Sequence, residues 1–306
     1  MKSKFIFIVI IVSLFQMRVS GSDVFKIGQF YYQIISDGEV ELVKNPSLGP
    51  AIDKRQYFDV PVIIPNEIIY KGNVYKVVSI GKNAFEFTQN IDTCFLGNNI
   101  KKIKDYAFSQ AKFNEIVMNE GLDSIMDNAF HYAEIHSVKF PSTVTYIGDF
   151  AFLQNSVNPY LKKVSMGDIK AKLGRYCFGG CAIDSIVFSD NIEVIPYCCL
   201  NGSSNLKYVE LGENTKEISN TAFSLLRQLE TVHFKKGLKK INNDSGDFFS
   251  YCDKLKTIII DSELPPVYDG KINTDVTSEK GTVEFKNVCF KYPNSEDYVL
   301  ENITFK

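Results

Sequence analysis

One pattern of apolar and polar positions repeats along most of this chain. A large apolar residue, usually preceded by alanine, recurs at intervals of 22 to 26 residues. We call these the ladder residues: Phe85, Phe108, Phe130, Phe152, Phe178, Leu200, Phe223 and Phe249. Five positions earlier stands another apolar residue, at Ile80, Ile103, Ile125, Ile147, Leu173, Ile195 and Ile218. A period of this length is typical of a solenoid, whose repeats stack on one another.

A second string, apolar-x-x-apolar-x-apolar, follows each ladder residue. Its copies are IDTCFL, FNEIVM, IHSVKF, LKKVSM, IDSIVF, LKYVEL, LETVHF and LKTIII. The alternation at its end predicts one short strand per repeat with one buried face. A single repeat cannot hide that face, so we expect about eight repeats to stack in parallel, roughly 4.8 Å apart. The sequence therefore predicts a β-rich repeat solenoid with the ladder residues inside its core, where they are structural.

The outward residues of these strands form two predicted columns. The first column is Thr93, Glu115, Ser137, Lys163, Ser185, Tyr208, Thr231 and Thr257, and the second is Phe95, Val117, Lys139, Ser165, Val187, Glu210, His233 and Ile259. Solenoids commonly bind partners through such extended faces, and several outward residues here are apolar where solubility alone would favour charge. We therefore take the columns as the candidate binding face, with a solvated face without ligand as the alternative.

The N-terminus has the pattern of a secretory signal peptide over residues 1–21. A basic start precedes the apolar run Phe5–Phe15, and the small residues Val19 and Gly21 precede a predicted cut before Ser22. The run is shorter than the roughly 20 apolar residues of a membrane span. We expect a secreted or cell-surface protein with no transmembrane segment after cleavage, and an uncleaved anchor is the alternative.

Segments on either side of the repeats follow other patterns. Residues 22–76 are rich in Tyr, Ile and Val and are interrupted at Asp37-Gly38 and Lys71-Gly72, which predicts hairpins that form an N-terminal β cap. The repeats are expected over residues 77–268, followed by a polar linker over 269–280 and a different segment over 281–306.

The charge and the cysteines narrow the chemistry. A net charge of -2 and a pI near 6.0 lack the positive field that nonspecific nucleic-acid binding requires. The seven cysteines cannot all pair within one exported chain. Most fit buried small apolar positions, while Cys177 and Cys199, one repeat apart, could alternatively form a disulfide. Together with Cys181 and Cys198 they lack the paired C-x-x-C spacing of a zinc site, so no metal is predicted.

No catalytic site is predicted. His131, His136 and His233 lie in three different repeats, and no nucleophile motif such as G-x-S-x-G accompanies them. The glycosylation sequons at Asn201, Asn243 and Asn302 matter only in a eukaryotic secretory pathway. We expect no cofactor.

The repeats resemble a known family. VVSIGKNAF, LDSIMDNAF, VTYIGDFAF and TKEISNTAF, each followed by the strand string, look like the BspA-type leucine-rich repeats of bacterial and some protist surface proteins. The resemblance covers about Val77 to Val267, and the departures are Leu200 on the ladder and Lys170 at a usually apolar position. It implies a surface-exposed or secreted protein associated with adhesion to host or bacterial macromolecules.

Residues 281–306 resemble something else, the opening strands of an ABC-transporter ATP-binding domain. Tyr292 matches the aromatic residue that stacks on adenine in that family. The phosphate-binding motif G-x-x-x-x-G-K-[ST] is missing, so no ATPase activity follows. A truncated fusion or gene-boundary artefact is favoured over a natural extra hairpin.

The function expected from these patterns is an exported or cell-surface leucine-rich-repeat protein. It would act as a non-catalytic adhesion module for a protein or other macromolecule on a host or neighbouring cell surface. The alternatives are a self-associating structural solenoid and an inactive truncated fusion to a transporter subunit. The oligomeric state is left open.

Overall fold

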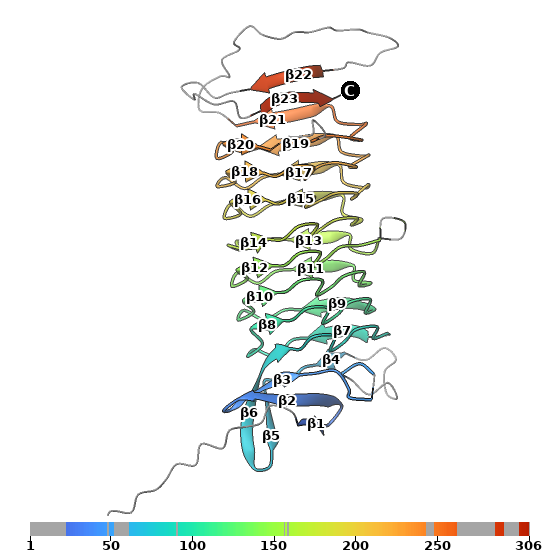
Figure 1. The fold of residues 1–306 in the computed structure, drawn as a ribbon, viewed down its shortest axis with the longest axis vertical. Helices are drawn as coiled ribbons and strands as arrows, with labels where there is room; N and C mark the ends of the chain where they lie inside the picture. Colours follow the sequence, from blue (N-terminus) through green and yellow to red (C-terminus); the bar gives the residue numbers. More distant parts are fainter. Residues whose placement is uncertain are drawn as a thin grey trace, which may run out of the picture.

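The protein is an elongated stack of β turns (Figure 1). The structure, a computed structural model, describes residues 23–47, 49–51, 61–89, 91–155, 157, 159–242 and 248–261, and the backbone strands 285–290 and 300–305. The predicted signal peptide, linker 269–280, Asn243 and Tyr292 lie outside these residues. Within them every regular element is a strand, and no helix could cross a membrane.

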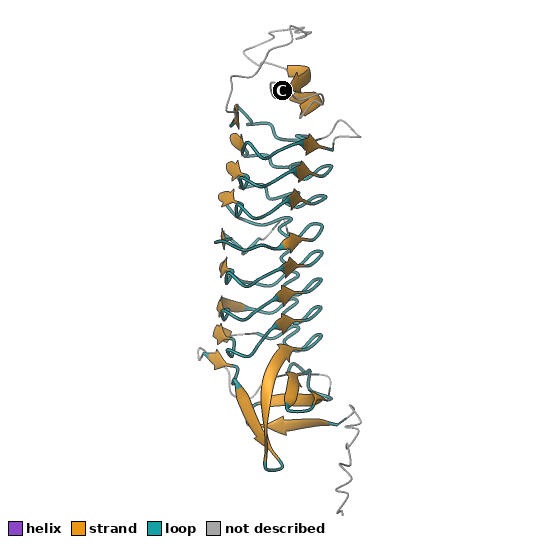
Figure 2. Cartoon of the chain, turned by 90° about the vertical axis from the view of Figure 1, so that its left-hand side faces the viewer, coloured by secondary structure: helices purple, strands orange, loops and turns teal. Residues whose placement is uncertain are grey.

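Two columns of parallel strands run along the stack (Figure 2). The predicted strand strings form the long-strand face: β7 (Ile91–Phe95), β9 (Phe113–Val117), β11 (Ser137–Lys139), β13 (Lys163–Ser165), β15 (Ser185–Val187), β17 (Tyr208–Glu210), β19 (Thr231–Phe234) and β21 (Thr257–Ile260). A second column, the short-strand face, comprises β8 (Lys102–Ile103), β10 (Ser124–Ile125), β12 (Tyr146–Ile147), β14 (Lys172–Leu173), β16 (Val194–Ile195), β18 (Glu217–Ile218) and β20 (Lys240–Ile241).

The solenoid fold is confirmed, but each turn carries two strands rather than the single one predicted. The extra strand ends at the apolar residue that stands five positions before the ladder residue, such as Ile103 before Phe108. It is two residues long, which is too short to show the alternation by which a strand is recognised in a sequence.

The ladder segments close the third side of every turn. Around Phe85, the residues two before and two after, Asn83 and Phe87, both have φ of 57°. Asparagine tolerates this left-handed conformation better than most residues, which accounts for Asn83 and Asn128, while Tyr106, Phe150 and Thr221 adopt the same conformation in other turns. The resulting backbone bonds the next turn: Phe85 N–H donates to the Ala107 carbonyl at 2.7 Å.

The ladder rings stack on one another inside the core. Phe85 and Phe108 lie 4.9 Å apart between centroids, Phe108 and Phe130 lie 5.1 Å apart, and Phe130 and Phe152 lie 4.8 Å apart. Their planes are within 7° of parallel. These spacings equal the distance between neighbouring strands, so each ring packs on the same ring of the next turn. All eight predicted ladder positions are buried, Phe249 at the end slightly less than the rest.

Hairpins cover the N-terminal end of the stack. β1 (Val24–Ile27), β2 (Phe30–Ser36) and β3 (Glu39–Leu42) form an antiparallel meander that turns at Asp37-Gly38. β5 (Glu67–Tyr70) and β6 (Asn73–Ile80) form the second predicted hairpin, turning at Lys71-Gly72.

Both strand columns begin on this cap. β3 and β6 pair in parallel, and β6 then pairs with β8, while β4 (Val62–Ile63) pairs with β7. The first strands of the repeats, β7 and β8, are therefore paired on their N-terminal side, and the long-strand sheet ends at the two-residue β4, a short edge that offers little template for association. Beyond the described turns, β22 (Phe285–Phe290) and β23 (Leu300–Phe305) form an antiparallel pair.

Candidate binding faces of the solenoid

The outward residues of the long-strand face lie in register. Thr93 pairs with Glu115 and Phe95 with Val117, and the same alignment joins Ser137 to Lys163 and Lys139 to Ser165. In the last turns Ser185, Tyr208, Thr231 and Thr257 align, as do Val187, Glu210, His233 and Ile259. Every one of these side chains is half-buried or exposed. The structure thus brings together both sets of predicted site residues as columns, apart from one interruption described below.

An apolar row begins the second column. Ile63 on β4 pairs with Phe95, which pairs with Val117, so three apolar side chains follow one another along the stack. They are 63%, 39% and 38% exposed. Thr93, Glu115 and Lys139 border this row with polar groups. An apolar centre with a polar rim is the arrangement found in protein interfaces.

The other end of the column is a charged network. The Glu210 carboxylate accepts a hydrogen bond from the Tyr208 hydroxyl and pairs with Lys235 at 2.9 Å. His233 lies between two carboxylates, 3.5 Å from Glu210 and 2.9 Å from Asp261. Bonding to Tyr208 holds the pKa of Glu210 below its usual range. Burial raises the pKa of Tyr208 to about 12. These side chains hold one another in place, so this end of the column is less available to a partner than the apolar row.

Both strand columns are interrupted between the fifth and sixth turns. The long-strand sheet that begins at β4 ends at β13, the short-strand sheet ends at β14, and new sheets begin at β15 and β16. The ladder segments remain bonded across this step, since Phe178 N–H donates to the Cys199 carbonyl at 3.0 Å and Gly180 N–H to Asn201 at 2.9 Å. The stack is therefore continuous on one side and open on two.

Pro196 explains the interruption of the short-strand sheet. In intact turns the residue after the short strand donates its N–H to the turn before, as Lys104 does to Ile80 and Ser219 to Ile195, both at 2.9 Å. Pro196 occupies this position in the sixth turn and has no N–H to give to Leu173. The missing donor removes one of the two bonds that would join β16 to β14; the other, from the Val194 N–H to the Ala171 carbonyl, is absent as well.

The fifth turn itself is irregular. Gly167 has φ of 55°. Other turns bury the residue three positions before the end of the short strand, a position that Lys170 occupies here. In the fifth turn Ile169 is fully buried instead, and Lys170 points outward. The irregular loop follows β13, whose edge faces β15 across the step. A shallow groove of about 700 Å³ lies there, lined by Lys163, Ser165, Asp168 and Val187 among others.

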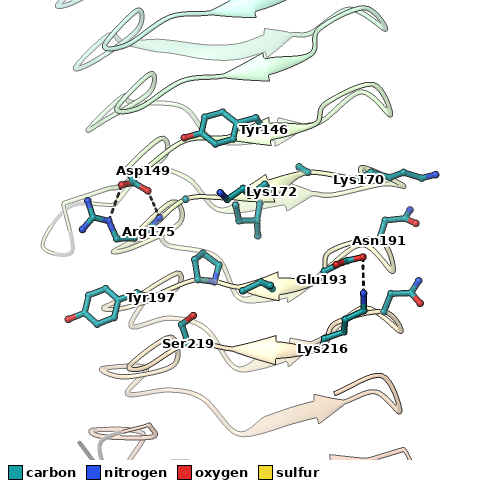
Figure 3. Close-up of a pocket in the computed structure, with 16 residues that line it drawn as sticks. Tyr146, Asp149, Lys170, Lys172, Arg175, Asn191, Glu193, Tyr197, Lys216 and Ser219 are labelled. Carbon is teal, nitrogen blue, oxygen red and sulfur yellow. Dashed lines mark hydrogen bonds and ion pairs between the residues drawn. The ribbon is translucent and has the colours of Figure 1, made fainter. Parts of the chain in front are cut away.

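A larger groove, the short-strand groove, lies over the same step on the other face. Its volume is about 1040 Å³. Figure 3 shows Lys170, Lys172 and Arg175 along the fifth turn, and Glu193, Tyr197 and Lys216 along the turns below. Two ion pairs cross its rim, Arg175 with Asp149 at 2.9 Å and Lys216 with Glu193 at 3.0 Å.

The six cysteines whose side chains the structure describes, Cys94, Cys177, Cys181, Cys198, Cys199 and Cys252, are free and buried. The Sγ atoms of Cys177 and Cys199 lie 3.6 Å apart, in contact but not bonded, so the disulfide that the spacing allowed is not formed. Both replace the alanine that precedes the ladder residue in most turns. Cys199 is larger than alanine and Leu200 is smaller than phenylalanine, so the sixth turn keeps its packed volume. The pair is therefore accounted for by packing.

The remaining candidate residues do not form a reactive cluster. His131 stacks on Tyr132, and its burial lowers its pKa. Among the described residues no group of three His, Cys, Asp or Glu side chains could hold a metal ion. Asn201 is half-buried, its amide donates to the Ser224 hydroxyl at 2.6 Å, and the sequon's Ser203 is fully buried, so the sequon is held within the turn.

Comparison with known families agrees with this geometry. The model of the BspA type leucine-rich repeat region matches residues 68–168 and 171–293, in 6 copies, which is more than half of the chain. The chain belongs to this family. The break in the match falls at residues 169 and 170, where the structure has the irregular fifth turn. The comparisons do not support the resemblance of residues 281–306 to an ABC-transporter domain, since the repeat match itself extends to residue 293.

Three solved structures to which the chain is similar come from bacteria. The chain is similar to the pneumococcal vaccine antigen PcpA, at 16% identity over 78% of this chain and 81% of that one, with a TM-score of 0.44. It is also similar to a leucine-rich repeat protein of T. pallidum, at 16% identity over 74% of this chain and 88% of that one, with a TM-score of 0.48. A third structure is a leucine-rich cell surface protein of Faecalibacterium prausnitzii, at 16% identity over 78% of this chain and 95% of that one, with a TM-score of 0.33. A search of curated proteins finds no match.

Two features of these BspA-type repeats were missed by the sequence patterns. Ile63 precedes the first strand string, so the period does not assign it to the apolar row. The short-strand groove was missed because the short strands were not predicted, although Pro196 and Lys170 both stand where the repeat pattern has other residue types. A search for positions that break the repeat could have found it.

Proposed function

We propose that this BspA-type protein is exported to the cell surface, where it binds a protein partner through its long-strand face and catalyses no reaction. The exposed apolar row of Ile63, Phe95 and Val117 is the observation that carries the proposal. Exposed apolar side chains that stand next to one another and are rimmed by polar groups characterise interaction sites. The family and the secretory pattern of the N-terminus support a location where such partners occur.

A binding partner explains the apolar row better than a fully solvated surface does. Its three side chains come from consecutive strands, so a partner touching one touches all three. Burying one such side chain contributes about 1.5 to 3 kcal/mol when it is fully removed from water. Part of that remains available here, because each side chain is more than one third exposed.

A binding experiment tests the face. The purified protein is passed over immobilised fibronectin, laminin, fibrinogen and collagen, and saturable binding to at least one is expected. The double variant Phe95→Glu/Val117→Glu should weaken that binding at least tenfold, because it places charge at the apolar centre. Val74→Glu is the matched control, since Val74 is exposed on the cap hairpin away from the row. Equal binding by the double variant would refute the assignment to this face.

Self-association through the same face is the competing function. Val187 and Ile259, both exposed in the second column, could meet a second copy. Light scattering of the purified protein separates the two functions: we expect a monomer. A stable dimer that Val187→Glu dissociates would replace the proposed function by a structural one.

Export has its own measurement. Mass spectrometry of the protein recovered outside the cells is expected to find a chain that begins at Ser22. An N-terminus at Met1 in a membrane fraction would indicate the uncleaved anchor instead.

A further inference from the structure

The short-strand groove is a site separate from the face to which the proposed function is assigned. It lies on the short-strand face, at the one step where Pro196 prevents β16 from pairing with β14. It therefore does not depend on the apolar row, and either site can exist without the other.

Backbone groups in this groove lack the partners they have in every neighbouring turn. By analogy with Thr145, which accepts from Lys172, and Ile147, which accepts from Gly174, the carbonyls of Ala171 and Leu173 face the groove. Neither carbonyl accepts a bond among the described residues, and the N–H of Val194 donates none. Ala171 and Leu173 are nearly buried. Polar backbone groups in such surroundings require water or a ligand.

The charges in the groove are unbalanced. Both of its carboxylates, Asp149 and Glu193, already have cationic partners in Arg175 and Lys216. Lys170 and Lys172 also line the groove, and neither forms an ion pair with any residue that the structure describes. The groove thus carries an excess of positive charge on a protein whose net charge is -2. An anionic ligand would complement it.

The rest of the lining suits a sugar. Tyr146 and Tyr197 stand on either side of the step, with Tyr197 exposed, and tyrosine rings offer flat apolar surfaces to pyranose faces (Figure 3). Asn191 and Asn214 add amide groups from the turns below. Sugar hydroxyls both donate and accept hydrogen bonds, so they match unpaired carbonyls and an unpaired N–H together.

An inserted peptide strand fits less well. A strand between β14 and β16 would need two strand spacings, about 9.6 Å. Cα atoms of β14 and β16 still lie within 8 Å of each other. An added peptide strand therefore has no room in the plane of the sheet, whereas a ligand lying in the groove over the step has a volume of about 1040 Å³.

We propose that the short-strand groove binds an acidic oligosaccharide, with a uronate-type carboxylate held near Lys170 and Lys172 and the sugar rings lying against Tyr146 and Tyr197. The unpaired carbonyls of Ala171 and Leu173 accept hydroxyl groups of the same ligand. The volume lies at the upper end of the range for small-molecule sites, which favours several sugar units over one.

Calorimetric titration of the full protein tests this, with trigalacturonate as the acidic probe. Maltotriose is the neutral probe of the same length, and hexaglutamate is the acidic probe without sugar rings. We expect saturable binding of trigalacturonate that weakens as salt is added, and much weaker binding of the other two. Lys170→Gln/Lys172→Gln should reduce the affinity roughly five- to tenfold. Lys102→Gln should leave it unchanged, because Lys102 occupies the same register position as Lys172 in an intact part of the sheet.

Pro196→Ser supplies a second, independent variant. Serine is the residue at the matching position one turn later, Ser219, where its N–H bonds Ile195. The variant should restore the missing bond to Leu173 and narrow the groove, so trigalacturonate binding should fall at least threefold while the protein stays folded.

Each contrary result overturns the proposal. No trigalacturonate binding at millimolar concentration removes the site, and unchanged affinity in the Lys170→Gln/Lys172→Gln variant moves it elsewhere. Equal binding of maltotriose refutes the role of charge. Tighter binding of hexaglutamate replaces the sugar by an acidic peptide. Because none of these measurements involves the apolar row, a negative result here leaves the proposed protein-binding function standing or falling on its own test.

Discussion

Truncating one ladder residue, Phe108→Ala, gives a direct measure of how much the stacked rings contribute to stability. Phe108 is fully buried and lies between two parallel rings, Phe85 at 4.9 Å and Phe130 at 5.1 Å, with Phe113 edge-on at 5.6 Å. Removing the ring loses its transfer free energy, about 1.5 to 3 kcal/mol. It also loses two stacked pairs at about 0.5 to 1.5 kcal/mol each. The sum agrees with the loss of roughly 3 to 5 kcal/mol measured when a buried phenylalanine is replaced by alanine in other protein cores.

We therefore expect Phe108→Ala to lower the free energy of unfolding by about 4 kcal/mol. Urea titration followed by circular dichroism and by tyrosine fluorescence measures it, since the chain has no tryptophan. Phe87→Ala is the matched control. Phe87 lies on a neighbouring ladder segment with φ of 57° but is 53% exposed, so its loss should change stability by less than about 0.5 kcal/mol.

The reasoning would be refuted if Phe108→Ala lost less than about 1 kcal/mol of unfolding free energy while circular dichroism and tyrosine fluorescence gave the same unfolding curve. It would mean that neighbouring turns close over the missing ring and that the ladder is not the main support of the stack. An equal loss in both variants would point to the backbone of the ladder segment rather than to the rings.

Two further predictions concern buried polar groups. Burial raises the pKa of Cys94 and of Cys252 to about 12, so native protein should resist maleimide at pH 8 and react fully once unfolded. Thiols in the unfolded chain have a pKa near 9, so the contribution of the buried thiols to the free energy of unfolding should be fully present below pH 9. It should fall between pH 9 and 12, by at most about 1.4 kcal/mol for each thiol and each pH unit. Urea titration at a series of pH values measures this loss. Glu41→Ala should cost about 2 kcal/mol, because the buried carboxylate binds Ser79 at 2.6 Å and Lys104 at 2.5 Å. Glu193→Ala, at an exposed pair, should cost under about 0.5 kcal/mol.

The stacked core could be predicted because one physical requirement recurs in every repeat. Each strand string has apolar residues at the same three positions, and a repeat that buries them must place its ladder residue in the same layer. The hairpins of the cap could be predicted for a local reason, since Asp37-Gly38 and Lys71-Gly72 supply residues that accept left-handed turns.

The candidate sites were only partly predictable. Equal spacing fixes the register of the columns, so Phe95 and Val117 could be aligned from the sequence. The charged network could not, because Lys235 and Asp261 lie outside the positions that the strand string assigns to the face. The sequence shows that Pro196 has no N–H to donate. Only the hydrogen bonds of the intact turns show that the Leu173 carbonyl is the acceptor that lacks this donor.

Four irregular features of this solenoid gather at a single step, and nearest-neighbour stacking explains why that is tolerated. An insertion after Phe152, the outward Lys170, Pro196 and the ladder exchange at Leu200 all fall within two turns. In a solenoid each turn contacts only its neighbours, so defects placed at one interface weaken that interface once, whereas the same defects scattered along the stack would weaken several. Here the ladder segments keep their hydrogen bonds across the step while both strand faces open. Repeat proteins of this kind can therefore gain a groove without losing the fold, provided that one side of the turn stays bonded.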